Sequence, residues 1–220
     1  MARRTAWVKW PSAAVNDGAL KLFHWNDGGR GEHVAALMCW IVIAHQADQD
    51  TGLALISFDD FNAVTGMSRG RIAKGLAHLR AFGIIDAGPK RGTYQLTPFD
   101  PLKGWAMLPN APMYRFGQVD LFNNMSARLP IHLDALKLLL LYAARRDTRS
   151  NTANISYDKI MAYTSIPRQR IAYANAYLAA NHLVFVETRP STISEGVSHR
   201  YRLNGINPYV HPGTTLKPGV

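Results

Sequence analysis

The chain has 220 residues, of which 47% are hydrophobic and 18% are charged, a composition typical of globular proteins and unlike that of disordered chains. Its longest apolar run, from Leu138 to Ala144, is far shorter than the roughly 20 residues of a membrane-spanning helix, and the single cysteine, Cys39, excludes an intrachain disulfide and a multi-cysteine metal site. Lysine and arginine outnumber aspartate and glutamate by 25 to 15, and the resulting net charge of +10 favours a polyanionic partner.

The first elements along the chain are a short lead segment over residues 7–23, a flexible loop over 26–31 and an apolar helix over about 33–47. The helix is predicted because apolar residues recur at the three- and four-residue spacings of a buried face. Cys39 lies among apolar neighbours in this helix, so we expect a buried structural thiol. The glycine-rich loop lacks a following Lys-Ser or Lys-Thr pair, which argues against a nucleotide phosphate site.

Two further helices follow, joined by a tight break. Ser57 precedes a short helix and has Asp60 three residues later, a pattern that caps free amides at a helix start. Gly66 suits the break because glycine tolerates a positive φ angle. Ser68 is placed to cap the next helix, over 69–82, which buries the positions Ile72, Leu76 and Leu79 and leaves Arg69, Gly70, Arg71, Lys74, Gly75 and His78 on its other faces.

A β-hairpin completes this unit. Short strands over 84–87 and 93–96 flank the turn-rich segment 88–92, whose tip carries Lys90 and Arg91. The segment 98–104 then contains two prolines and a glycine, which indicates a linker between domains.

The chain repeats itself at an offset of about 99 residues. The matching positions include Ile56, Ser57, Asp59, Arg69, Arg71, Ile72 and Ala73, which recur as Ile155, Ser156, Asp158, Arg168, Arg170, Ile171 and Ala172, together with the pairs His33 and His132 and, after a slip of one residue, Trp7 and Trp105. The repeat predicts an internal duplication with a first domain over 1–97, a linker over 98–104, a second domain over 105–206 and an extended tail over 207–220.

The second copy is predicted to have helices over about 133–146, 156–164 and 167–181 and a hairpin of strands over 183–187 and 199–203. It differs from the first copy in charge, because residues 1–103 hold 12 basic and 9 acidic side chains whereas residues 104–220 hold 13 and 6. It also has Asn175 where the first copy has Leu76. Either the second helix is slightly rotated or Asn175 forms a hydrogen bond inside the domain.

The order of helix, helix, tight turn, helix and basic hairpin resembles the winged helix-turn-helix family over residues 56–96, and the second copy resembles it again. The layout of two such domains resembles plasmid replication initiators and transcriptional regulators of mobile elements. The resemblance implies an α+β fold, mainly α, in which each recognition helix enters the major groove of DNA.

The DNA-binding side chains that we expect lie on the two recognition helices and the two hairpins. They are Ser68, Arg69, Arg71, Lys74 and His78 with Lys90 and Arg91 in the first copy, and Arg168, Gln169, Arg170 and Tyr173 with Arg189, His199 and Arg200 in the second. The four repeated arginines could contact guanine or phosphate, or could form a solvated helix face. Tyr173 and Tyr177 suit either core packing or hydrogen bonds to phosphate.

We therefore expect sequence-specific binding of double-stranded DNA, as a transcriptional regulator or replication initiator of a plasmid or mobile element. The alternatives are a protein-interaction subunit of a chromosome-organising complex and a nonspecific architectural DNA binder. The eight histidines lack metal-site spacing and no catalytic motif is present, so we expect no enzyme activity, metal, cofactor or small-molecule substrate. The N-terminus lacks the pattern of a secretory signal, which favours a cytoplasmic, nucleoid-associated protein. The expected partner is double-stranded DNA, and a second copy of the chain or another protein is a further candidate.

Overall fold

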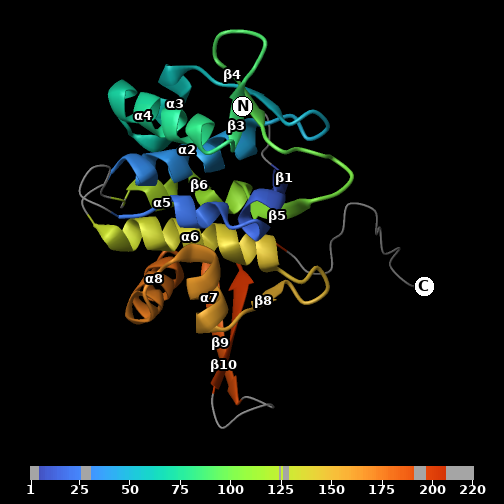
Figure 1. The fold of residues 1–220 in the computed structure, drawn as a ribbon, viewed down its shortest axis with the longest axis vertical. Coiled ribbons are helices and arrows are strands. Elements are labelled where there is room, and N and C mark those ends of the chain that lie inside the picture. The colour runs from blue at the N-terminus through green and yellow to red at the C-terminus, as the bar shows by residue number, and fades with distance from the viewer. Residues whose placement is uncertain (1–4, 26–30, 124, 126–128, 191–196, 207–220) are drawn as a thin grey trace.

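A computed structural model of the chain describes residues 5–25, 31–123, 125, 129–190 and 197–206. The fold is α+β and mainly helical, and it contains two successive units of helices followed by a hairpin, as expected for two tandem winged-helix-like domains (Figure 1). The glycine-rich loop and the C-terminal tail that the sequence predicts fall largely or wholly outside the described residues.

The first unit contains helices and a small sheet in the predicted order. Its elements are β1 (Trp7–Pro11), α1 (Ala13–Asn16), the 3-10 helix η1 (Ala19–Leu22), α2 (Glu32–Gln46), β2 (Leu53–Leu55), α3 (Phe58–Thr65), α4 (Arg69–Ala81), β3 (Ile85–Ala87) and β4 (Thr93–Leu96). The strands form an antiparallel sheet in the order β2-β4-β3, so the predicted hairpin of β3 and β4 carries a third strand that the sequence analysis missed.

The second unit repeats this architecture. Its elements are β5 (Trp105–Pro109), η2 (Ala111–Met113), β6 (Tyr114–Arg115), β7 (Gln118–Val119), α5 (Asp120–Asn123), α6 (Pro130–Arg145), β8 (Thr152–Asn154), α7 (Tyr157–Thr164), α8 (Arg168–Ala180), β9 (Val184–Pro190) and β10 (Val197–Leu203). The sheet order is β8-β10-β9, which matches the order in the first unit.

Local chemistry explains where the helices of the helix-turn-helix begin and end. Ser57 and Asp60 form a capping box at the start of α3, and the Ser68 hydroxyl accepts a hydrogen bond from the backbone amide of Arg71 at the start of α4. Gly66 ends α3 with a φ of 68°, as predicted. In the second unit Ser165 adopts the same left-handed conformation, with a φ of 55°, although it is not a glycine.

One prediction about α4 is wrong, because Gly75 is buried and does not lie on an exposed face. A Cβ atom at this position would lie 2.9 Å from the backbone carbon of Ala35 and from the backbone nitrogen of Ala36. The absence of a side chain therefore allows α4 to pack closely against α2. The equivalent residue in α8 is Ala174, which is also buried.

The two units are joined through a strand pair that has local two-fold symmetry. Strands β1 and β5 are antiparallel, with Trp7 opposite Pro109 and Pro11 opposite Trp105. Since Trp7 and Pro11 are the repeat equivalents of Trp105 and Pro109, each pair maps onto the other when the copies are exchanged. The two repeats thus meet across an isologous interface of the kind found in symmetric homodimers.

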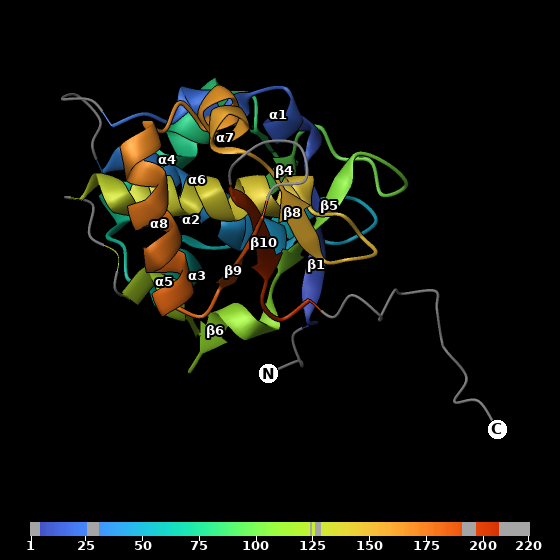
Figure 2. The same cartoon turned by 90° about the horizontal axis from the view of Figure 1, so that it is seen from below.

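Packing across this interface is reciprocal and merges the two cores. Helix α6 of the second unit contacts both α2 and α1 of the first (Figure 2). In addition, η1 of the first unit contacts α7 of the second, and β7 of the second contacts α3 of the first. The buried apolar residues form one continuous cluster. The Lys137 ammonium in α6 donates a hydrogen bond to the backbone oxygen of Phe23 at 2.6 Å, which ties the second unit to the lead segment of the first.

Helix α2 is buried at every position from His33 to His45, and so on all its faces, whereas the sequence pattern predicted one buried face. Cys39 is fully buried, and burial raises the pKa of its thiol, as expected for a structural cysteine. Asn175 is buried and accepts a hydrogen bond from the Tyr142 hydroxyl at 2.8 Å, so the second of the two alternatives for this residue is confirmed.

Within the described part of the chain, no helix is both long and apolar enough to cross a bilayer.

Candidate nucleic-acid interface

The two predicted recognition helices lie on the same side of the molecule. Helices α4 and α8 lie in opposite halves of the molecule along its long axis (Figure 1). Both are on the left in the two ribbon views (Figures 1 and 2). The hairpins of β3 with β4 and of β9 with β10 extend toward opposite ends of the long axis (Figure 1). One side of the molecule thus presents both helices between the two hairpins.

The first arginine of each recognition helix forms an exposed ion pair with the preceding helix. Arg69 lies 2.6 Å from Asp59, and Arg168 lies 2.7 Å from Asp158, with each side chain more than 60% exposed. These arginines keep their predicted exposed positions at the helix N-termini. Since exposed pairs contribute only about 0–1 kcal/mol, each arginine can exchange its carboxylate partner for a phosphate at little cost.

In the first unit the recognition helix and the hairpin converge on one hollow of about 370 Å³. Arg69 from α4 and Arg91 from the turn before β4 both line it, together with Phe58, Asp59 and Tyr94. Lys90 lies beside Arg91 and is exposed. The predicted helix and hairpin residues are therefore brought together, in an arrangement that suits a phosphate group held by two guanidinium groups.

The equivalent place in the second unit is filled by aromatic rings. His199 stacks on Tyr157 with ring centroids 5.2 Å apart, and the Arg168 guanidinium lies 5.4 Å from the centroid of the same tyrosine. His199 and Arg200 lie within strand β10, where Arg200 is opposite Glu187, and so they are away from the hairpin tip. The prediction that both lie in the second strand of the hairpin is confirmed, although β10 begins two residues earlier than expected. The side chain of Arg189 lies outside the described residues.

Two further predicted residues of α4 share an acidic partner at the start of α2. Lys74 lies 2.6 Å from one Glu32 carboxylate oxygen and His78 lies 3.0 Å from the other. The hydrogen bonds from Lys74 and then from His78 hold the pKa of Glu32 below its ordinary value. His33 packs edge-on against His78, and it is buried as a packing residue.

The second arginine of each recognition helix has a different environment in the two units. Arg170 lies 2.6 Å from Asp134, a carboxylate of α6 whose side chain is only 4% exposed. Burial raises the pKa of Asp134 despite the favourable charge of Arg170. Arg71 is exposed, and within the described residues no acceptor lies within hydrogen-bond distance of its guanidinium. The difference arises because Ala35 stands in α2 at the repeat position of Asp134.

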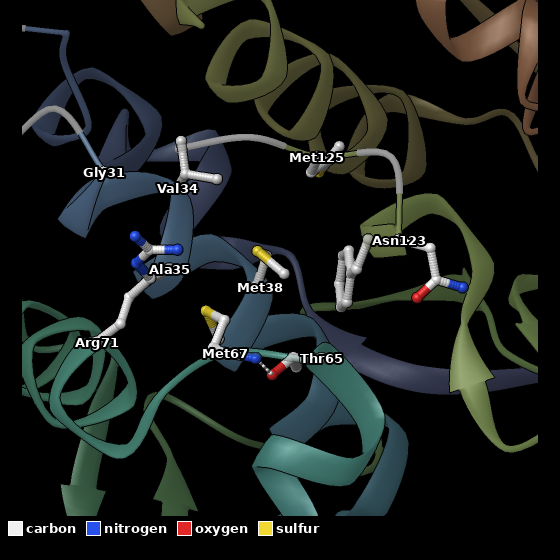
Figure 3. A pocket seen from close by; sticks show the side chains of 11 residues that line it. Gly31, Val34, Ala35, Met38, Thr65, Met67, Arg71, Asn123 and Met125 are labelled. Carbon is white, nitrogen blue, oxygen red and sulfur yellow. Dashed lines mark hydrogen bonds between the residues drawn. The ribbon is translucent and has the colours of Figure 1, made fainter. Parts of the chain in front are cut away.

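Arg71 borders a second hollow, of about 210 Å³, between the two units (Figure 3). The lining comes from α2, from the turn between α3 and α4, and from α5 and the residues after it. The Arg71 side chain extends toward α2 near Gly31 and Ala35, while Met38 and Met67 lie deeper between the elements (Figure 3). This arginine is therefore placed at the border between the surface of α4 and the contact between the repeats.

The remaining predicted residues of α8 divide between surface and interior. Gln169 and Tyr173 are exposed, so both remain candidates for contact with a partner. The ring of Tyr177 packs 5.0 Å from that of His132, as expected for a packing role. The packing alternative therefore holds for Tyr177, whereas a hydrogen bond from Tyr173 to phosphate stays a prediction.

The acidic partners of the predicted cations were not predicted from the sequence. Asp59 and Asp158 repeat at the same offset as Arg69 and Arg168. Because each acid and each arginine recur together, their pairing in both copies could have been predicted from the repeat. Glu32 and Asp134 have no acidic counterparts in the other copy. Their contacts with α4 and α8 depend on how the helices pack, so spacing along the chain gave no indication of them.

The described residues contain no cluster of three or more histidine, cysteine, aspartate or glutamate side chains placed to hold a metal ion. Comparison of the chain with protein-family models gave no match, and neither did a search of curated proteins.

Proposed function

We propose that the protein binds double-stranded DNA sequence-specifically, as a transcriptional regulator or replication initiator of a plasmid or mobile element. The observation that carries the proposal is an exposed arginine at the start of both α4 and α8, two helices that lie on one side of a basic molecule. Side chains at this end of a recognition helix reach base edges or flanking phosphates in a major groove. Such an activity implies a cytoplasmic, nucleoid-associated protein.

The symmetry of the strand pair β1 and β5 supports a more specific form of the proposal. Two-fold symmetry in a DNA-binding protein is mirrored by half-sites that are inverted relative to each other. The target is therefore an imperfect palindrome whose half-sites lie about one helical turn apart, roughly 10 base pairs from centre to centre. The half-sites differ, because Arg71 is without a carboxylate partner among the described residues whereas Arg170 is held by Asp134.

Selection of bound fragments from random double-stranded DNA tests this proposal. The expected product is one motif with two inverted, unequal halves. Replacement of Arg69 and Arg71 by alanine is expected to relax the preference in one half, whereas replacement of Lys90 and Arg91 is expected to weaken all sequences alike. If repeated selection enriches no motif, and affinity depends on salt but hardly on sequence, nonspecific architectural binding replaces the proposal.

A second candidate function, docking of a partner protein, is favoured by an exposed apolar site away from α4. Leu55 is 74% exposed and Phe116 is fully exposed, and both line a hollow of about 450 Å³ formed by the two units. Contiguous exposed apolar surface is typical of interaction sites, and these two side chains line the same hollow. This function becomes the better account if no DNA binding is detected at low salt, where contacts to phosphate are strongest.

A further inference from the structure

We infer that the hollow beside Arg71 is a binding site for a small carboxylic acid with an apolar or aromatic body. The hollow has a volume of about 210 Å³ and lies where α2, the turn before α4 and the end of α5 meet (Figure 3). It therefore has walls from both repeats and one cationic side chain, Arg71, at its edge.

The second repeat shows which group is missing from this site. There, the carboxylate of Asp134 is buried beside the Arg170 guanidinium at 2.6 Å. In the first repeat the equivalent residues are Ala35 and Arg71, so the arginine is retained while its carboxylate is absent. A second charged residue is also absent from the first repeat, one turn further along the helix. The buried cation Lys137 of α6 has the uncharged Met38 as its equivalent in α2. The first repeat thus has a hollow, with Arg71 at its edge, where the second has an internal carboxylate and ammonium group.

The chemistry of the walls defines the rest of the ligand. Val34, Met38, Met67 and Phe122 line the hollow and are buried by the surrounding protein. The Thr65 hydroxyl also lines it, but it donates a hydrogen bond to the backbone oxygen of Phe61 and accepts one from the amide of Met67. An apolar cavity of about 150 Å³ holds benzene, so this volume suits one ring with a carboxylate that pairs with Arg71.

Occupancy of this site has a consequence for the arginine. A bound carboxylate holds Arg71 at the hollow through charge-assisted hydrogen bonds, just as Asp134 holds Arg170. The regulatory part of the inference rests on the proposed function, since it requires Arg71 to contact DNA when the hollow is empty. A ligand of this class departs from the sequence-based expectation that the protein has no small-molecule partner.

Methyl resonances of methionine give a direct test on the full chain. Benzoate is the probe, benzamide is its neutral counterpart, and inorganic phosphate is the anion without an apolar body. We expect benzoate to shift the signals of Met38, Met67 and Met125, which line the hollow, and to leave those of Met107 and Met113 unchanged, because these lie in the core elsewhere. Benzamide is expected to bind at least tenfold more weakly.

Two variants locate the effect. Arg71→Gln is expected to weaken benzoate binding about ten- to a hundredfold. Arg80→Gln, which changes another exposed arginine of α4, is the control that leaves benzoate binding unchanged. Ala35→Asp supplies the internal carboxylate and is expected to abolish binding. If Ala35→Asp does not fold, Arg71→Gln decides alone. The inference is overturned if benzoate at about 10 mM, which nearly saturates a site with a Kd of about 1 mM, shifts none of the three signals. It is also overturned if phosphate is equally effective, or if Arg71→Gln binds benzoate as well as the unmodified chain does.

DNA binding is then measured with and without benzoate, so that the two proposals fail separately. A change in the preferred half-site on benzoate addition supports regulation through Arg71. Benzoate binding without any DNA binding keeps the ligand site and removes the proposed function. If saturating benzoate changes neither the affinity for DNA nor the preferred sequence, the ligand site is retained but its regulatory role is overturned.

Discussion

Removal of the carboxylates that pair with the first recognition-helix arginines is expected to strengthen DNA binding. The changes are Asp59→Asn and Asp158→Asn, alone and together. Each carboxylate lies within 3 Å of its arginine, so a phosphate bound to the same guanidinium lies about 7 Å from the carboxylate. Two like charges at that distance repel by about 0.6 kcal/mol in water.

This repulsion corresponds to about a threefold gain in affinity for each substitution and to roughly sevenfold for both. Stability is expected to change little, because the pairs are exposed. The assay is fluorescence anisotropy with the selected DNA at low salt, repeated at higher salt, where screening reduces the gain. Asp50→Asn, which removes an exposed charge from the loop before β2, is the control for net charge.

Two results would refute the reasoning. If both substitutions weaken binding, the carboxylates orient the arginines for contact and do not compete with phosphate. If Asp50→Asn raises affinity as much as Asp59→Asn, only the net charge of the protein matters and the ion pairs at α4 and α8 have no local role.

Three further predictions concern stability, measured by urea denaturation. Gly75→Ala is expected to destabilise the fold by about 1–3 kcal/mol, because the added Cβ atom would lie 2.9 Å from the backbone of α2. The control Gly70→Ala places its Cβ atom in open space and is expected to stabilise the fold by up to about 1 kcal/mol. Equal effects of the two substitutions would contradict the close packing of α4 against α2. Asn175→Leu is expected to lower the free energy of unfolding by about 1–3 kcal/mol, because it leaves the Tyr142 hydroxyl unpaired. The double variant with Tyr142→Phe should recover most of this loss. If the effects of the two substitutions are additive, the hydrogen bond between the two side chains does not contribute. Burial lowers the pKa of Lys137 to about 8, so the unfolded chain binds more protons above that pH and stability rises with pH through this group. The free energy of unfolding of the unmodified chain should therefore rise by about 2 kcal/mol relative to that of Lys137→Met between pH 7 and 9.5, and a constant difference between the two would exclude the shift.

Helices and hairpins could be predicted from the sequence because their signals are local. The capping pair of Ser57 and Asp60 and the apolar spacing of α2 depend on residues a few positions apart. The burial of Gly75 was missed because a glycine has no side chain whose hydropathy would indicate a packed face. The strands β2 and β8 were missed because three residues are too short to show alternation.

The arrangement of the site depended on tertiary packing. The repeat revealed Arg71 and Arg170 as equivalent residues, but their different environments follow from Asp134, which precedes Arg170 by 36 positions and lies in another helix. Hydropathy alone suggests a solvated aspartate at that position, and the structure instead buries it beside α8. Likewise, the two-fold axis became visible only from the register of β1 and β5.

A hydroxyl-radical footprint on the selected DNA tests the central claim most directly, namely that α4 and α8 occupy successive major grooves. One chain is expected to protect about 20 base pairs, since equivalent faces of DNA recur about every 10 base pairs. Replacement of Arg168 and Arg170 by alanine is expected to remove protection from one half of the site only. A footprint of about 10 base pairs for the unmodified chain, unchanged by the same replacements, would contradict the account.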